Sequence, residues 1–414
     1  MKRETNSNKS VPIAWTIQFL LLMSGPPKFR VRDTQDLVGG SLDFALIAQI
    51  AVWLFAGLWI AWDLRKNPLT LRKNIHGTVL LFFVALVLSL LKAKFIALTA
   101  FKLYQIAITI LFIVCFVRKF GASTALSFLS KACLLLSALI TAGIVFLPDI
   151  VIPLSETGFP RLRGWGIADA HVVSSIALVL LLCGYPRMNK WISLLLAAWL
   201  ASLLFLSLTR AAWAGFAVSV FLAMLIRPKI WSLNWLRAGC VAAVLVFVSM
   251  GVEFFNQFRD QDSLYELSDR AFLWGYLAEQ TSKHSPYLGL GYFSASRVLA
   301  AEWNPDYGTA HSIFMESFVG AGAFGLVAFV LLVASMSIYA SQIGWKRDDA
   351  FSFALISLWP MLIITGMFGS ELDSTPFSFT FWLLCVLLAL FRPGRSTSSV
   401  WAEPSLHASP IATM

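Results

Sequence analysis

Long runs of apolar residues recur throughout this 414-residue chain, and they restrict its fold more than any other feature of the sequence. A helix needs about 20 mostly apolar residues to cross a lipid bilayer. Only 13% of the residues are charged, against about a quarter in soluble proteins, so lipid is the expected surroundings of most of the chain. The candidate spans lie at 11–25, 43–62, 77–91, 97–117, 124–147, 166–184, 191–208, 211–226, 238–252, 311–342, 351–369 and 376–391. We therefore predict an all-α polytopic membrane protein with about twelve transmembrane helices.

Lysine and arginine residues determine the predicted orientation of these helices, because they concentrate in cytoplasmic loops. With the N-terminus inside, every second loop is short and basic, as at 118–119, 186–190 and 345–347. Most acidic residues then fall in the other loops, and both termini are predicted to be cytoplasmic. The predicted division of the chain is transmembrane helices 1–9 in residues 1–252, a long outer loop with amphipathic helices in 253–310, transmembrane helices 10–12 in 311–391 and a cytoplasmic tail in 392–414.

Several cations remain on the predicted outer side, where they oppose the insertion bias. They are Lys28, Arg30, Arg32, Arg161, Arg163, Arg210, Arg259, Arg270, Lys283 and Arg297. Outward positive charge needs another reason, and binding of an anionic ligand supplies one. The net charge of +10 does not favour nucleic acid as a partner, because the basic residues are scattered over short loops and form no dense patch.

The outer loop at 253–310 differs in composition from a disordered linker. Between 254 and 280, aromatic residues and leucines recur at roughly helical spacing, which predicts one or two amphipathic helices at the membrane surface. A glycine-rich turn follows at 285–292, and the chain then leads to His311. A folded outer loop of this kind either forms a site or only caps the helices, and its composition fits both interpretations.

Polar residues near the predicted outer side of the membrane are candidate catalytic or ligand-binding residues. Arg210 lies between two apolar runs, where a cation is costly unless it pairs or meets a ligand; the alternative is an arginine that reaches the lipid headgroups. Arg270 follows Asp269 in the predicted loop helix and forms either a ligand contact or an exposed ion pair. His311 begins a span and acts either as a general base near neutral pH or as a hydrogen-bonded interfacial histidine. Glu316 either orients the imidazole or braces the interior.

Four short elements follow one another between about residues 160 and 330. They are Arg161-Leu162-Arg163-Gly164; Leu208-Thr209-Arg210-Ala211; Asp269-Arg270 with Trp274 and then Pro286-Tyr287-Leu288-Gly289-Leu290-Gly291; and His311 with Glu316 and Gly320-Ala321-Gly322-Ala323-Phe324-Gly325. In this order, within a polytopic chain, they resemble the O-antigen ligase and polysaccharide polymerase superfamily of bacterial membrane glycosyltransferases. Two positions depart from the family pattern: Ser312 replaces the usual Asn after the histidine, and Asp169-Ala170-His171 replaces a His-Asn pair.

The resemblance implies a reaction and a set of site residues. Members of the superfamily take a glycan from undecaprenyl diphosphate, without metal or nucleotide, and join it to a sugar hydroxyl at the periplasmic face of the inner membrane. By position, Arg210 and Arg270 would hold the diphosphate, and His311 would accept or position the proton of the attacking hydroxyl. A single displacement with one base predicts inversion at the anomeric carbon. The residues expected to contact substrate are Arg161, Arg163, Trp274 and Glu316.

Other polar groups are interpreted as structural. His171 enters a span from the outer side, and helix packing is the favoured role. Asp260-Gln261-Asp262 has the DxD form with which many glycosyltransferases hold a divalent metal, but two acids in three residues are common by chance. The sequence contains no zinc-protease, nucleotide or dinucleotide motif. The five cysteines lie in apolar runs without a CxxC pair, which favours reduced core residues. We expect neither a metal nor a cofactor.

The two candidate functions within this superfamily differ in the molecule that accepts the glycan. An O-antigen ligase transfers the glycan to a lipid A core, whereas a polymerase joins it to another lipid-linked repeat unit or a growing polysaccharide. One dominant outer loop with a short loop at 148–165 slightly favours ligation. A transporter of polysaccharide or lipid-linked glycan is the alternative from another class. Transporters usually have internal repeats and spans broken near the midplane, whereas the spans here read as unbroken.

Overall fold

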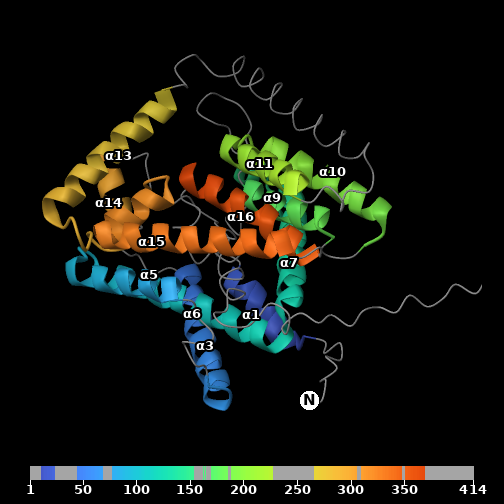
Figure 1. The fold of residues 1–414 in the computed structure, drawn as a ribbon, viewed down its shortest axis with the longest axis horizontal. Coiled ribbons are helices and arrows are strands. Elements are labelled where there is room, and N and C mark those ends of the chain that lie inside the picture. Colours follow the sequence, from blue (N-terminus) through green and yellow to red (C-terminus); the bar gives the residue numbers. More distant parts are fainter. Residues whose placement is uncertain are drawn as a thin grey trace, which may run out of the picture.

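The computed structural model describes residues 11–23, 44–68, 77–152, 162, 164, 169–184, 188–226, 265–304, 309–346 and 350–368. Within these ranges the fold consists of helices without strands, which confirms the all-α prediction (Figure 1). The helices are α1 (Ile13–Met23), α3 (Phe44–Lys66), α5 (Gly77–Leu88), the short 3-10 helix η1 (Ser89–Lys92), α6 (Ile96–Phe120), α7 (Ala122–Phe146), α8 (Pro148–Val151), α9 (Ala170–Leu182), α10 (Lys190–Leu206), α11 (Arg210–Ile226), α13 (Tyr265–His284), α14 (Ser294–Trp303), α15 (Ile313–Lys346) and α16 (Ala350–Phe368).

Helices coincide with every predicted span that falls within the described residues. Three stretches in that part of the chain are long and apolar enough to cross a membrane by themselves, namely Ile96–Phe120, Thr124–Phe146 and Ile313–Gln342. Shorter apolar helices occupy most of the other predicted positions. The spans predicted at 238–252 and 376–391 lie outside the described residues. The total of twelve spans and their orientation stay predictions.

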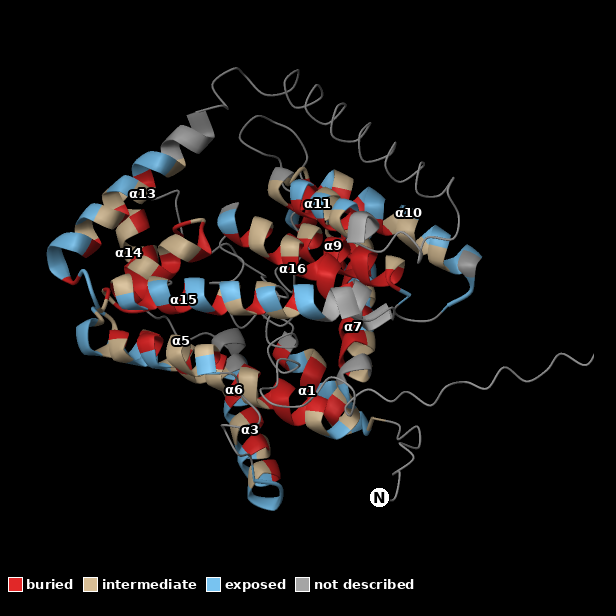
Figure 2. Cartoon of the chain, viewed as in Figure 1, coloured by how far each residue is buried: buried red, intermediate tan, exposed pale blue. Residues whose placement is uncertain are grey.

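The interior between the helices is apolar and rich in aromatic rings. Trp15 and Phe19 on α1 pack on α6, with ring centroids 5.3 Å apart in both the Trp15–Phe112 and the Phe19–Phe116 pairs. Burial is concentrated where helices face one another (Figure 2). Large apolar side chains such as Leu58 are exposed on the outward faces, as expected for helices whose solvent is lipid.

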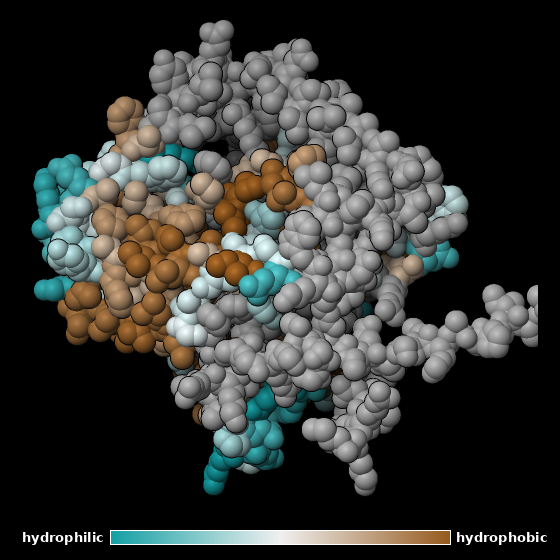
Figure 3. Space-filling model, viewed as in Figure 1, coloured by the Kyte–Doolittle hydropathy of each residue, from teal (hydrophilic) through white to brown (hydrophobic). Residues whose placement is uncertain are grey.

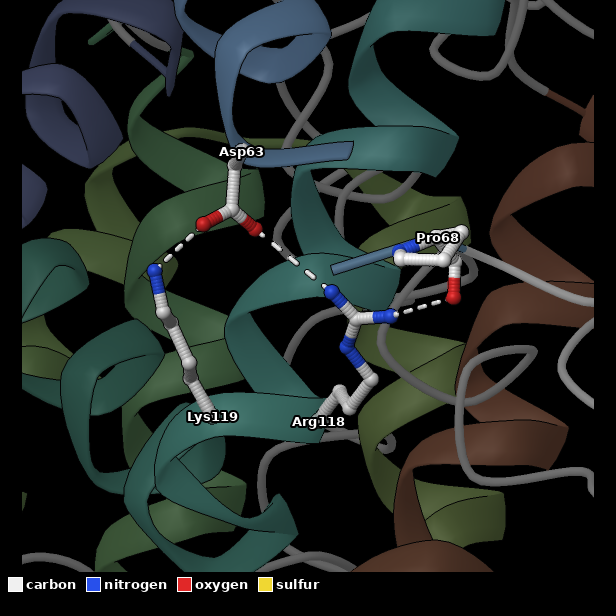
Figure 4. A network of polar contacts seen from close by, with 4 residues as sticks. All are labelled: Asp63, Pro68, Arg118 and Lys119. Atoms are coloured by element: carbon white, nitrogen blue, oxygen red, sulfur yellow. Dashed lines mark hydrogen bonds and ion pairs between the residues drawn. The ribbon is translucent and has the colours of Figure 1, made fainter. Parts of the chain in front are cut away.

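Ion pairs connect the last turn of α3 with the last turn of α6 (Figure 4). The buried Asp63 carboxylate accepts a hydrogen bond from Lys119 Nζ at 2.5 Å and lies 3.6 Å from the Arg118 guanidinium. Arg118 also donates to the Pro68 carbonyl at 3.4 Å, and Lys119 Nζ lies 4.8 Å from the ring centroid of Trp15 on α1. These contacts join three helices at the end that the charge pattern predicts to be cytoplasmic.

Helix α15 is broken at Gly322, where φ is 67° and ψ is −166°. The expectation of unbroken spans was therefore wrong for this helix. The break leaves backbone N–H groups without partners inside the helix, and the glycine-rich turn satisfies them. Ala323 donates to the carbonyl of Pro286 at 2.8 Å, and Phe324 donates to that of Tyr287 at 3.3 Å.

The glycine-rich turn also binds the part of α15 that precedes the break. The N–H groups of Leu290 and Gly291 donate to the carbonyls of Val319 and Gly320, at 2.9 and 3.0 Å. Gly289 has a φ of +69°, and a Cβ there would lie 2.4 Å from the Gly320 carbonyl carbon, so no larger residue fits. The two glycine motifs therefore form one joint between the loop and α15, which we call the glycine joint.

The predicted outer loop is a folded layer with its own small core. Helix α13 lies in the predicted loop and overlaps the residues predicted to form an amphipathic helix, whereas α14 was not predicted. The buried residues of this core are Leu273, Leu277, Ala295, Ala300, Ala310 and Val319. Figure 1 shows α13 and α14 together at one edge of the molecule. Figure 3 shows polar surface at the α13 edge and apolar surface beside it, over α15 and α5.

Candidate functional site

His311 lies in the connection between α14 and α15, and its backbone is left-handed with a φ of 52°. Such a conformation costs about 1–3 kcal/mol in a non-glycine residue and persists only where the surroundings hold it. Among the described residues, Leu208 and Phe293 are the other non-glycine positions with positive φ. Leu208 lies in the turn before Arg210, and Phe293 directly precedes α14. The non-glycine residues with a strained backbone therefore lie at or near the candidate site residues.

The residue before the histidine is held from both sides. The buried Ala310 donates its N–H to Glu316 Oε1 at 3.1 Å, and its carbonyl accepts from Trp274 Nε1 at 2.7 Å. Glu316 Oε2 accepts from Ser296 Oγ at 2.5 Å. Helices α13, α14 and α15 each contribute one group, so the connection is fixed to all three. Glu316 is thus a buried brace and Trp274 a second one, while direct contact of either with substrate stays a prediction.

The surroundings of His311 disfavour its charged form. Burial is the largest cause, and the positive charges of Arg270 on α13 and Arg297 on α14 add to it, so the pKa of His311 falls to about 4. The imidazole is therefore neutral at pH 7 and able to accept a proton. The sequence pointed to Arg270 but counted Arg297 only among the outward cations. Its position against the insertion bias was the signal that could have identified it.

Arg210 is the first residue of α11, and contacts across the α10–α11 connection fix its backbone. Trp213 Nε1 donates to the carbonyl of Leu204 at 2.8 Å, which closes the turn over the end of α10. Leu162, which separates two arginines in the sequence, donates its backbone N–H to the carbonyl of Leu206 at 3.1 Å. The first of the four sequence elements is therefore attached to the end of α10, just before the second element.

Helix α16 packs against both α11 and α15. A Cβ at Gly215, in the second turn of α11, would lie 3.3 Å from the carbonyl oxygen of Met361 on α16. The next residue of α16, Leu362, lines an apolar crevice together with Ile313 at the start of α15. One short part of α16 thus lies beside the second turn of α11 and beside the crevice that Ile313 helps to line.

Other predicted site residues fall partly outside the described residues. The structure describes neither Arg161 and Arg163 nor the side chain of Arg210, and Asp260-Gln261-Asp262 also lies outside. His171 is the second residue of α9, and its neighbours Ala170 and Val172 are buried. No group of three His, Cys, Asp or Glu side chains that could hold a metal ion occurs in the described part of the chain.

The region that contains this site also matches a known family. Residues 192–330 match the sequence model of the O-antigen ligases. The resemblance to the O-antigen ligase and polysaccharide polymerase superfamily is confirmed. No curated protein matches the chain.

The O-antigen ligase match runs from α10 into α15. It contains Arg210, Arg270 and His311, together with the glycine joint and the braces around Ala310. The Arg161–Gly164 element and α16 lie outside the matched residues. Both are nevertheless attached to the matched region, by the Leu162 hydrogen bond and by the contacts of α16 with α11 and α15.

Proposed function

We propose that the protein transfers a glycan from undecaprenyl diphosphate to a sugar hydroxyl at the periplasmic face of the bacterial inner membrane. Two findings support the proposal: the O-antigen ligase match, and a neutral histidine held beside arginines in the same region. The donor supplies the glycan and its own leaving group, so the residues need only bind, orient and move one proton.

The reaction is a single displacement in which charge develops on the leaving group. The acceptor oxygen attacks the anomeric carbon, the bond from that carbon to the phosphate oxygen breaks, and the electron pair remains on the diphosphate. The hydroxyl proton passes to the imidazole of His311. Guanidinium groups match phosphate oxygens with paired hydrogen bonds, so Arg210 and Arg270 would stabilise the developing charge. Attack from the face opposite the leaving group inverts the anomeric carbon.

The single observation that carries this proposal is that the O-antigen ligase match contains Arg210, Arg270 and His311, with the charge of Arg270 acting on His311. A base that must act at neutral pH has to be unprotonated before its substrate arrives, and burial with two nearby arginines achieves this here. Those same cations are the groups that an anionic donor requires.

The acceptor is the least determined part of the proposal. One dominant outer loop favours a lipid A core as acceptor, which makes ligation our first choice and joining of lipid-linked repeat units the alternative. Deleting the gene distinguishes the two. Loss of ligation leaves full-length polymer on undecaprenyl diphosphate, whereas loss of polymerisation leaves single repeat units on the carrier.

Substitutions in purified protein test the reaction itself. We expect Arg210→Ala, Arg270→Ala and His311→Ala each to abolish transfer from a lipid-linked donor in liposomes, while membrane insertion is retained. Loss of a general base alone costs about 10²- to 10⁴-fold in rate. Lys283→Ala is the matched control, because this exposed cation on α13 pairs with Glu279 and should be dispensable. Normal product formation by Arg210→Ala would contradict the mechanism.

A further inference from the structure

An apolar groove lies between α1 and α3. Its volume is about 410 Å³, within the range of about 300–1,000 Å³ that is usual for small-molecule sites. Ile17 on α1 and Phe55 on α3 are half exposed in its lining, so the groove opens outward, towards lipid in a membrane. The complete lining consists of Ala14, Ile17, Gln18 and Leu21 of α1 and Ala51, Val52, Phe55 and Trp59 of α3.

The groove runs inward from the end of the molecule at which α3 and α6 finish. Trp59, in its lining, is edge-on to Trp15 with 5.9 Å between ring centroids, and the Trp15 centroid lies 4.8 Å from Lys119 Nζ in the last turn of α6. The stretch of α3 from Trp59 back to Ala51 rises about 12 Å along the helix. Half of the hydrocarbon core of a bilayer is about 15 Å thick. The groove therefore has nearly the depth of one lipid leaflet.

Basic residues lie at the tryptophan end of the groove. The last turns of α3 and α6 contain Arg65, Lys66, Arg118 and Lys119, and the buried Asp63 pairs with the last two (Figure 4). Lys66 Nζ lies 4.5 Å from the ring centroid of the exposed Trp62. Tryptophan rings beside lysine and arginine are typical of the level of the phospholipid headgroups. The charge at this level favours an anionic headgroup.

Gln18 interrupts the apolar lining of the groove. Its side chain is 2% exposed, and its Nε2 atom has no hydrogen-bond partner among the residues that the structure describes. A buried amide N–H without an acceptor is costly, so an acceptor supplied by a ligand would stabilise this position. Gln18 follows Trp15 by three residues and lies about 4.5 Å deeper along α1. The ester carbonyl oxygens of a phospholipid lie at that level, directly below the headgroup.

We propose that this groove binds one anionic phospholipid from the leaflet at the basic ends of α3 and α6, the predicted cytoplasmic leaflet. The headgroup phosphate lies near Lys66 and Lys119, the Gln18 amide donates to an ester carbonyl oxygen, and one acyl chain fills the groove as far as Ala51. The bound lipid stabilises the packing of α1 on α3.

The lipid site is separate from the histidine site. The first turn of α6 contacts α14 through a 2.7 Å hydrogen bond between the hydroxyls of Thr99 and Ser294, whereas its last turn carries Lys119. Helix α6 has 25 residues, so its two ends are about 37 Å apart. Lipid binding is therefore expected to be independent of the proposed reaction.

Lipid titration of full-length protein in detergent tests the proposal, with phosphatidylglycerol as the anionic probe and phosphatidylcholine as the neutral comparison. Native mass spectrometry should show one retained phosphatidylglycerol. Gln18→Leu should weaken its binding about fivefold, the effect of losing one hydrogen bond. In Ala51→Phe the added ring occupies the groove, so the retained lipid should be lost. Ala61→Phe is the matched control, because Ala61 is an exposed residue of α3 that does not line the groove.

The headgroup contact is tested by charge. Lys66→Ala should weaken binding of phosphatidylglycerol about fivefold and leave that of phosphatidylcholine unchanged. Lys94→Ala is the control, because this exposed lysine precedes the first turn of α6, at the opposite end of the helix, and pairs with Glu302 at 3.2 Å. An equal affinity of wild-type protein for the two lipids would overturn the proposal.

Thermal unfolding separates a ligand contact of Gln18 from a structural one. Without lipid, Gln18→Leu should unfold at a higher temperature than wild type, because it removes a buried N–H that lacks an acceptor. Added phosphatidylglycerol should stabilise wild type more than this variant. A lower unfolding temperature of lipid-free Gln18→Leu, or equal lipid retention by Ala51→Phe and Ala61→Phe, would overturn the proposal. Dimers that disappear in Ala51→Phe would also overturn it, by assigning the groove to a second copy of the chain.

Discussion

In the proposed reaction His311 has to be neutral when the acceptor arrives, yet it must be basic enough to take a proton. In the free protein, burial and the charges of Arg270 and Arg297 lower the pKa of His311 to about 4, which secures the neutral form but makes a weak base. A bound diphosphate would offset those positive charges. The pKa of His311 should then rise towards its ordinary value, so donor binding itself would strengthen the base.

We predict that Arg297→Gln raises the pKa of His311 above about 4. Removing a nearby positive charge lowers the cost of protonating the imidazole, so the protonated form survives to higher pH. The measurement is a pH titration by NMR of protein with ¹³C-labelled histidine, in which the His311 signal is assigned by its loss in His311→Gln. Lys283→Ala is the matched control, because it removes a cation that pairs with Glu279 and is not among the charges that act on His311. An unchanged midpoint for His311 would show that Arg297 does not act on it.

At the scale of single elements, the connection that carries the histidine depends on one carboxylate. Glu316→Ala would leave the N–H of Ala310 buried without a partner, at about 1–3 kcal/mol, and would leave the hydroxyl of Ser296 with only the Phe293 carbonyl at 3.3 Å. We predict a lower unfolding temperature and strongly reduced transfer. Glu316→Gln should keep most of both, because an amide oxygen can accept from Ala310 and an amide N–H can donate to Ser296. Equal losses in the two variants would mean that the negative charge, rather than the hydrogen bonds, is what the site needs.

The glycine joint gives a second prediction at this scale. Gly289→Ala places a Cβ within 2.4 Å of the Gly320 backbone at a φ of +69°, so the turn cannot stay docked on α15. We expect loss of transfer and a clearly lower unfolding temperature. Gly275→Ala on α13 is the matched control, because nothing lies within 4 Å of its Cβ and alanine favours a helix by about 0.5–1 kcal/mol. The contrast between the two variants, measured by thermal unfolding in detergent, separates the joint from a general sensitivity to added methyl groups.

Much of this element order could be predicted from the sequence, because hydropathy is a local property. The helices match the predicted spans wherever the residues are described, and α13 matches an amphipathic pattern. The short helix α14 was missed because it lies among glycines and small residues that also suit a turn. The break at Gly322 was missed because its cause is the hydrogen bonding of a distant turn. The same holds for the site: Arg270 and His311 could be named from the sequence, whereas the effect of Arg297 on His311 depends on where the fold places α14.

At the scale of the whole molecule, charged residues serve different purposes in different places. Asp63 is bound by Lys119 and Arg118, which neutralises charge and joins α1, α3 and α6. Around His311, burial and the positive charges of Arg270 on α13 and Arg297 on α14 favour the neutral imidazole. An ion pair in which the charges cancel is typical of a structural contact, whereas cations placed together are typical of a site for an anionic ligand. The basic residues at the ends of α3 and α6 also determine the predicted orientation of the chain.

The proposed reaction depends on the predicted membrane orientation, which cysteine labelling can test. If the positive-inside pattern holds, Asn67 after α3 faces the cytoplasm and Lys283 at the end of α13 faces the periplasm. A membrane-impermeant maleimide should label Lys283→Cys in intact cells with a permeable outer membrane, and should label Asn67→Cys only after the inner membrane is disrupted. Cys115, Cys133 and Cys183 are buried, and replacing Cys240 and Cys385 by alanine in the parent protein leaves the introduced cysteine as the thiol that the reagent reports. The opposite labelling pattern would place Arg270 and His311 on the cytoplasmic side, away from a donor glycan presented to the periplasm, and transfer by this site could not occur there.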